Sequence, residues 1–264
     1  MDAPAPDRLL HARAVLLDLD GVLYVEDEPI EGALEAVAAL RDRGLRLRFV
    51  TNTTSRPRRD ILARLERLGI PVPERELVTP ASLAVEHCLA AARLRALLLM
   101  RDEVKADLAG LQEVRERADV VVVGDLGEDF GYRVLNQAFR ELLAGAELVA
   151  LQKNRYWRTP DGLSLDVGPF VAALEYATGR DAVVVGKPAS AFFATVLAGL
   201  EVGPADAVMV GDDVESDVGG ALRAGLAGVL VRTGKYRPEA VAASGVEPTA
   251  TVDSIADVPT LLGA

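Results

Sequence analysis

Short apolar runs alternate with amphipathic segments along almost the whole chain of 264 residues. The apolar runs predict strands at residues 14–19, 45–51, 96–100, 118–124, 147–152, 181–186, 205–211 and 227–232. Several of these runs are rich in valine on both faces of the strand. Continuous apolar runs of this kind are typical of parallel strands that helices cover on both sides.

The segments between these runs have apolar residues at helical spacing. They predict helices at residues 31–43, 58–68, 80–92, 103–113, 132–144, 167–178, 189–200 and 215–224. Many of them are followed by a glycine, which is a common helix stop: Gly44, Gly69, Gly145 and Gly225. The alternation predicts an α/β fold with a doubly wound, Rossmann-like parallel sheet.

The first predicted strand ends in two carboxylates, Asp18 and Asp20, and Gly21 follows at once. Residues i and i+2 of a strand point to the same side, so the two carboxylates can face one site. Two like charges at a strand end need compensation, which a divalent cation with oxygen ligands provides. The pair therefore predicts a site in which one carboxylate is a nucleophile and the other an acid and base.

Polar residues also follow three later strands, and ligands of doubly wound sheets bind at such carboxyl ends. These residues are Thr51 and Asn52, Lys187, and Asp212 with Asp213 and Asp217. Taken singly, each has an ordinary interpretation as a turn residue, a helix cap or a surface lysine. Together they supply a nucleophile, a metal site, a positive charge and an acid, which is what phosphoryl transfer requires.

The residue types indicate how the work of phosphoryl transfer is divided. Asp18 is predicted to attack, and Asp20 to give a proton to the leaving group and later to take one from water. The Thr51 hydroxyl and nearby backbone amides, with Asn52, are predicted to bind phosphoryl oxygens. Lys187 is predicted to provide the fixed positive charge.

Asp212 is predicted to join Asp18 and the backbone carbonyl of Asp20 around Mg²⁺, which usually keeps some of its water. A further carboxylate is expected behind these ligands, to orient the lysine or metal-bound water. Asp217 and Asp213 are both candidates for that place, and the sequence does not decide between them.

Four motifs carry a resemblance to a known family: residues 18–23, 51–52, 186–188 and 211–217. In order and in placement at strand ends they resemble the four motifs of the haloacid dehalogenase superfamily of phosphatases. The spacing resembles the NagD-type subgroup, because 135 residues lie between Thr51 and Lys187, enough for a whole inserted α/β unit. The expected domains are a catalytic core of residues 1–79 and 183–264 and an inserted cap of residues 80–182.

Further stretches resemble one branch of that superfamily, which holds the phospholysine phosphohistidine inorganic pyrophosphate phosphatases and their hydrolase-domain-containing relatives. They are residues 51–55, 168–171, 174–178, 211–221 and 231–238. The resemblance implies Mg²⁺ as cofactor and a small phosphorylated metabolite, a phosphoamino acid or pyrophosphate as substrate. It also implies a homodimer that pairs through the cap.

The most unusual stretch of the expected cap is residues 152–159, which holds the only tryptophan and several basic residues in an acidic chain. One interpretation is a loop in which Asn154, Arg155 and Trp157 meet the leaving group. The other is a polar loop whose aromatic residues pack at an interdomain or dimer interface. The sequence favours neither.

The formal net charge of -11 argues against general binding of nucleic acids and of anionic membrane surfaces. The single cysteine, Cys88, excludes an intrachain disulfide and is expected to be a buried, inert thiol. Residues 1–11 do not resemble a signal peptide and no apolar run reaches membrane-spanning length, so a cytoplasmic protein is expected.

The alternative function is a signalling or binding module that carries a phospho-aspartate with little turnover. Response-regulator receivers use similar residues, but they are about half this length and carry the acceptor on a later strand. Dehalogenase chemistry does not need Asp20 or Asp212, and the superfamily's mutases carry a small cap after the first motif. A Mg²⁺-dependent phosphatase is therefore the favoured prediction.

Overall fold

The structure is a computed structural model that describes residues 7–159 and 162–263. The chain forms two compact units, and each is discontinuous in sequence. The first comprises Met1–Thr51, Leu62–Val78 and Lys187–Ala264, and the second comprises Asn52–Ile61 and Thr79–Gly186. The expected division into a core of residues 1–79 and 183–264 and a cap of residues 80–182 stays a prediction.

The first unit is built on a parallel sheet with the order β15-β14-β13-β1-β4-β5. Its strands are β1 (Ala14–Asp18), β4 (Arg46–Val50), β5 (Leu77–Val78), β13 (Ala207–Gly211), β14 (Ala227–Val231) and β15 (Ala250–Val252). β1 lies between β13 and β4, and every residue of β1, β13 and β14 is buried. The central strands are therefore covered on both faces, as their apolar sequences predict.

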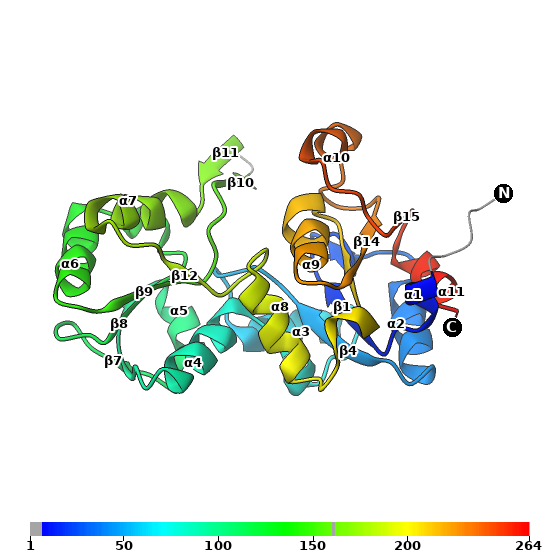
Figure 1. Cartoon of the computed structure of the whole chain (residues 1–264), viewed down its shortest axis with the longest axis horizontal. Coiled ribbons are helices and arrows are strands. Elements are labelled where there is room, and N and C mark those ends of the chain that lie inside the picture. Colours follow the sequence, from blue (N-terminus) through cyan, green and yellow to red (C-terminus); the bar gives the residue numbers. More distant parts are fainter. Residues whose placement is uncertain (1–6, 160–161, 264) are drawn as a thin grey trace. The chain divides into compact units, whose positions relative to one another are not determined.

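Helices flank this sheet (Figure 1). They are α1 (Asp7–Leu10), α2 (Ala33–Asp42), α3 (Arg58–Arg67), α8 (Ser190–Ala198), α9 (Gly220–Arg223), α10 (Pro238–Ser244) and α11 (Val258–Leu261). In α2 the buried residues Ala33, Ala36, Val37 and Leu40 recur at helical spacing. The α/β, Rossmann-like core predicted from the sequence is thus confirmed.

A small antiparallel flap follows β1. It consists of β2 (Tyr24–Val25) and β3 (Glu28–Pro29). The turn into the flap has Gly21 at a φ of 84°, and the Gly21 amide donates a hydrogen bond of 2.7 Å to the Tyr24 carbonyl. This left-handed conformation favours glycine and lets the chain reverse directly after Asp20.

The second unit contains a parallel sheet with the order β12-β9-β8-β6-β7. Its strands are β6 (Arg95–Leu99), β7 (Gln112–Glu113), β8 (Val120–Val123), β9 (Glu147–Ala150) and β12 (Val183–Val184). Its helices are α4 (Pro80–Ala90), α5 (Asp102–Lys105), α6 (Tyr132–Leu143) and α7 (Gly168–Thr178). Helices α6 and α7 pack on the apolar face of β6, β8 and β9. Cys88 is fully buried in α4, as expected of an inert thiol.

Three segments differ from the sequence predictions. The helix predicted at 103–113 is only α5 and a 3-10 turn, Ala106–Leu108, because Gly110 precedes the edge strand β7. The helix predicted at 215–224 begins as a π-helical turn, Val214–Gly219, and continues as α9. The stretch predicted as a loop at 152–159 ends in a strand, β10 (Tyr156–Thr159), which pairs with β11 (Gly162–Leu165).

The remaining short elements are 3-10 turns at Glu74–Glu76, Gly127–Asp129, Pro204–Asp206 and Ile255–Asp257. Among the helices of the described residues, none has the length and apolar character needed to cross a membrane.

Helix α2 offers a matched test of how the first unit is packed. Leu40 is fully buried and Leu34 is 46% exposed on the same helix. Leu40→Ala should lower the free energy of unfolding by about 2–5 kcal/mol, because it removes buried methyl groups and leaves a cavity. Leu34→Ala should change it by less than about 0.5 kcal/mol. Urea denaturation followed by circular dichroism measures both, and equal losses would contradict this packing.

Candidate active site

The centre of the site is the Lys187 ammonium group, which lies between two carboxylates in the first unit. Its Nζ donates a hydrogen bond of 2.6 Å to Asp18 Oδ1 and lies 2.6 Å from Asp217 Oδ1 in an ion pair. All three side chains are buried, and that of Lys187 is 2% exposed. A buried lysine is stable as a cation only when acids lie this close.

Parallel pairing places these groups at one edge of the sheet. Asp18 is the last residue of β1, and its register partner on β4 is Val50, so Thr51 follows at the same level. On the other side β1 pairs with β13, which ends at Gly211 directly before Asp212. Thr51 and Asp212 are both buried. The strand ends predicted to form a site are thus neighbours.

The two oxygens of Asp212 have different surroundings. Oδ2 accepts a hydrogen bond of 2.7 Å from the backbone amide of Lys235. Oδ1 is buried and has no hydrogen-bond partner among the described residues. An acceptor buried without a partner costs free energy, so this oxygen is suited to bind a group that the protein itself does not supply.

Three carboxylates form the acidic part of the site. One oxygen each of Asp18, Asp212 and Asp217 lies within 4.8 Å of the others. Lys187 offsets only one of the three negative charges, so the cluster has an excess of negative charge when all three are ionised. Carboxylate oxygens are the ligands that Mg²⁺ prefers, and the partnerless Asp212 Oδ1 adds a ready donor. The residues present therefore fit Mg²⁺.

Burial and mutual repulsion shift the ionisation of this cluster. Burial raises the pKa of Asp212 to about 8, and the charges of Asp18 and Asp217 add to the shift. Burial also raises the pKa of Asp217 to about 7, which Lys187 opposes and Asp18 reinforces. Burial by itself would lower the pKa of Lys187. The negative charges of Asp18 and Asp217 outweigh this effect, so the pKa of Lys187 is raised.

Asp213 and Asp217 have separate places. The Asp213 carboxylate accepts hydrogen bonds of 3.1 Å from the Glu215 amide and 2.9 Å from the Ser216 amide, so it caps the turn that follows β13. Asp217 is the residue that contacts Lys187. The spacing of the acids in the sequence could not show which of Asp213 and Asp217 contacts Lys187 and which caps the turn.

Two other predicted site residues are not members of this buried cluster. The Asp20 side chain is exposed, directly after β1. Asn52 belongs to the second unit, where its Oδ1 lies beside Gly186. If Gly186 carried a Cβ, that atom would lie only 2.9 Å from Asn52 Oδ1. The chain crosses between the units directly after Thr51 and directly before Lys187.

The candidate substrate contacts of the second unit lie on the hairpin and at its base. Trp157, on β10, is 51% exposed, and Arg155 is exposed beside it. The base is fixed by buried Gln152, whose Nε2 donates a hydrogen bond of 2.5 Å to Asp166 Oδ1 and whose Oε1 accepts one of 2.5 Å from the Asn154 amide. Burial raises the pKa of Asp166. This polar network could not be predicted from the sequence, because it depends on how the hairpin folds back onto Gln152.

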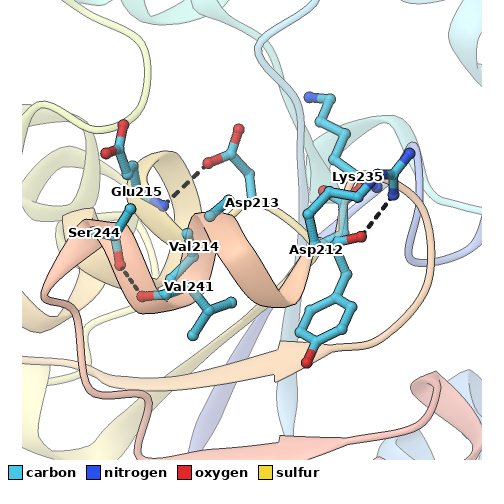
Figure 2. A pocket seen from close by; sticks show the side chains of 11 residues that line it. Asp212, Asp213, Val214, Glu215, Lys235, Val241 and Ser244 are labelled. Atoms are coloured by element: carbon cyan, nitrogen blue, oxygen red, sulfur yellow. Dashed lines mark hydrogen bonds between the residues drawn. The ribbon is translucent and has the colours of Figure 1, made fainter.

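A cavity of about 290 Å³ adjoins Asp212 within the first unit. In Figure 2, Glu215 and Ser244 lie on one side and Asp212 and Lys235 on the other, with Asp213, Val214 and Val241 between them. Burial lowers the pKa of Lys235, but the nearby carboxylates, Asp212 first among them, together raise it, and the net shift is upward. In the sequence, residues 231–238 are distinguished only by their family resemblance, and nothing there connects them with Asp212.

Comparison with known proteins agrees with this fold. Residues 15–112 match the family described as haloacid dehalogenase-like hydrolase, and residues 184–258 match the HAD-hydrolase-like family. The chain is 47% identical over 225 residues to haloacid dehalogenase-like hydrolase domain-containing protein 2 of Bos taurus, covering 85% of this chain and 86% of that protein.

Two further relatives are named as phosphatases. The phospholysine phosphohistidine inorganic pyrophosphate phosphatase of Homo sapiens is 41% identical over 266 residues, covering 98% of this chain and 97% of the relative. The crystal structure of a glycerol phosphate phosphatase from Mycobacterium tuberculosis, in complex with magnesium, matches with a TM-score of 0.81 and 31% identity, covering 95% of this chain and 77% of that one.

A Rossmann-like core with a buried lysine–carboxylate cluster at the carboxyl ends of its parallel strands is the arrangement expected of a hydrolase of this class. The chain belongs to the haloacid dehalogenase-like hydrolases. The resemblance to this family and to the branch of the human phosphatase is thereby confirmed, and so is the prediction that the chain is an enzyme.

The ionisation of the acidic cluster predicts how stability depends on pH. With raised carboxyl pKa values of about 8 and 7, the folded protein holds protons that the unfolded chain, with ordinary values near 4, has already lost. Stability without metal should therefore fall as pH rises from about 5 to 8. Mg²⁺ should raise the melting temperature more at pH 8 than at pH 6, because it stabilises the ionised cluster.

Differential scanning calorimetry in EDTA and in Mg²⁺ at both pH values measures this effect. In Asp212→Asn the fall between pH 6 and pH 8 should be smaller and the response to Mg²⁺ should be lost. Wild-type stability that rises over this range, with an unchanged response in the variant, would contradict the assignment.

Proposed function

We propose that this hydrolase is a Mg²⁺-dependent phosphatase that acts on a small phosphorylated molecule through an aspartyl-phosphate on Asp18. One observation carries the proposal. The Asp18 carboxylate, at the end of the central strand, is held 2.6 Å from a buried lysine and within 4.8 Å of two further buried carboxylates. A nucleophile, a fixed cation and a set of hard oxygen donors are thus in one place.

In the first step an Asp18 oxygen attacks phosphorus and the bond from phosphorus to the leaving oxygen breaks. Asp20 donates the proton that the leaving oxygen takes. In the second step water attacks the aspartyl-phosphate, Asp20 takes the proton of the water, and the bond from phosphorus to Asp18 breaks to release phosphate. The exposed position of Asp20 suits exchange of that proton with solvent.

Lys187 offsets negative charge on the phosphoryl group during both steps. Its second partner, Asp217, holds the ammonium group beside Asp18 and has no other role in the proposed chemistry. The Thr51 hydroxyl and the Asn52 amide bind phosphoryl oxygens. Thr51 is supported by its buried place at the end of β4, beside Asp18 in register.

Asp18, Asp212 and the backbone carbonyl of Asp20 would hold Mg²⁺. When bound, the ion supplies positive charge for the phosphoryl oxygens. Asp213 supports this arrangement as the cap of the following turn rather than as a ligand.

The substrate class follows from the relatives and from the second unit. The human relative is named for phospholysine, phosphohistidine and inorganic pyrophosphate, and the mycobacterial one for glycerol phosphate. We infer a small phosphorylated metabolite, a phosphoamino acid or pyrophosphate. The second unit would act as a cap whose Asn154, Arg155 and Trp157 meet the leaving group. Pairing of two chains through this cap and a cytoplasmic location remain expectations.

Removing the nucleophile or the acid tests the mechanism. With p-nitrophenyl phosphate and Mg²⁺, Asp18→Asn should abolish phosphate release, because no carboxylate is left to attack. Asp20→Asn should lower kcat by about 10²–10⁴-fold, the usual contribution of a general acid and base. Asp213→Asn, which changes a cap and no reacting group, should keep kcat within a few-fold. Asp18→Asn with full turnover would refute the mechanism.

The same assay separates the phosphatase from a phospho-aspartate signalling module. A phosphatase releases many phosphates per chain and carries little acid-stable label between turnovers. A chain that takes up one phosphoryl group and keeps it for hours, with negligible release, would favour the signalling module instead.

The hairpin of the second unit should influence which substrate is preferred. Trp157 and Tyr156 are neighbours on β10 and are 51% and 57% exposed, and they point to opposite faces. Trp157→Ala should change the ratio of kcat/KM between two phosphorylated substrates by about 5–30-fold, which corresponds to about 1–2 kcal/mol. Tyr156→Ala should leave that ratio within twofold. Unchanged ratios in both variants would give Trp157 a structural role.

A further inference from the structure

The turn between β14 and α10, residues 232–237, reaches the catalytic strand ends without contributing a reacting group. The backbone amide of Lys235 donates a hydrogen bond of 2.7 Å to Asp212 Oδ2 (Figure 2). The Thr233 hydroxyl donates one of 2.5 Å to the carbonyl of Gly21, in the turn that follows Asp20. One short segment is thus bonded to both strand ends that would hold the cation.

Two glycines give this contact its shape. Gly21, at a φ of 84°, and Gly234, at a φ of 58°, both approach Asp212 Oδ2 so closely that a Cβ on either would overlap this oxygen. A Cβ on Gly234 would also lie 2.5 Å from the Cα of Gly21. Gly234 is therefore needed for two reasons: its backbone is left-handed, and the space beside it is filled by the carboxylate.

The result is an asymmetric carboxylate. The Lys235 amide and the two glycines surround Asp212 Oδ2, while buried Oδ1 has no hydrogen-bond partner among the described residues. A side chain that is held by one oxygen presents the other in a fixed direction. Groups that orient a ligand in this way commonly change metal affinity although they do not touch the metal.

We propose that the 232–237 turn positions the cation site: Gly234 and the Lys235 amide fix Asp212 so that Oδ1 is free for the ion, and Thr233 fixes the turn that carries the Asp20 carbonyl. The inference rests on the proposed function in one respect, the binding of Mg²⁺ at Asp212. It adds that the turn sets the affinity for the ion, whereas the four motifs contain the groups that react.

A matched pair of glycines tests the proposal. Gly245 ends α10 at a φ of 66°, and a Cβ there would meet nothing within 4 Å. Gly234→Ala and Gly245→Ala thus bear a similar backbone penalty, but only the first pushes Asp212 aside. Calorimetric titration of the metal-free protein with Mg²⁺ should show affinity about 10–100-fold weaker in Gly234→Ala and within twofold of wild type in Gly245→Ala.

A second pair keeps the test valid if Gly234→Ala does not fold. Thr233→Val removes the hydroxyl that bonds Gly21 and keeps the shape of the side chain. It should weaken Mg²⁺ binding by about tenfold, and Thr233→Ser, which restores the hydroxyl, should recover most of the loss. Kinetic titration should show the same shift in the Mg²⁺ concentration for half-maximal rate, with kcat at saturating Mg²⁺ within a few-fold of wild type.

The outcomes distinguish a failure of this positioning role from a failure of the proposed Mg²⁺-dependent phosphatase function. Wild-type affinity in Gly234→Ala and in Thr233→Val would overturn the positioning role, and so would equal losses in Gly234→Ala and Gly245→Ala. A wild-type protein that releases phosphate without binding Mg²⁺ would overturn the proposed cofactor, and with it the inference. Melting temperatures of the variants in EDTA measure any general loss of stability. They do so independently of the positioning role and of the proposed cofactor.

Discussion

The ion pairs of Lys187 are the interaction on which the site depends. A lysine that is 2% exposed keeps its charge only because Asp18 and Asp217 lie 2.6 Å from its Nζ. In return, the ammonium group allows carboxylates to gather at the end of a buried strand, where they would otherwise repel each other. Loss of either partner leaves a buried charge uncompensated. The chemistry and the stability of this part of the sheet are therefore linked.

The fold supplies the conditions for that pair. Parallel strands bring β1, β4 and β13 to the same edge in register, so residues distant in sequence meet without a dedicated loop. Beyond the strand ends, backbone amides hold two of the carboxylates: the Asp213 amide donates a hydrogen bond to Asp217, and the Lys235 amide donates one to Asp212. The carboxylates of the cluster thus lie at or just after the strand ends, and the turns beside them hold their side chains.

Much of the first sheet, and the meeting of polar groups at its strand ends, could be predicted from the sequence, because apolar strands and the acids that follow them are local signals. Asp18, Lys187 and Asp217 come together as the motif order implies. The 232–237 turn could not be connected with Asp212, since that contact depends on how β14 lies beside β13. The β10–β11 hairpin could not be predicted because each of its strands has only four residues, too few for a clear periodic pattern.

The direct test of the central claim is a crystal structure of the protein grown with Mn²⁺ in place of Mg²⁺, with anomalous scattering used to locate the ion. We expect one strong anomalous peak bound by Asp18 and by the oxygen of Asp212 that Lys235 leaves free, with Lys187 still paired to Asp18. A fully occupied ion elsewhere, with the Asp18–Lys187–Asp217 cluster unchanged and free of metal, would contradict it.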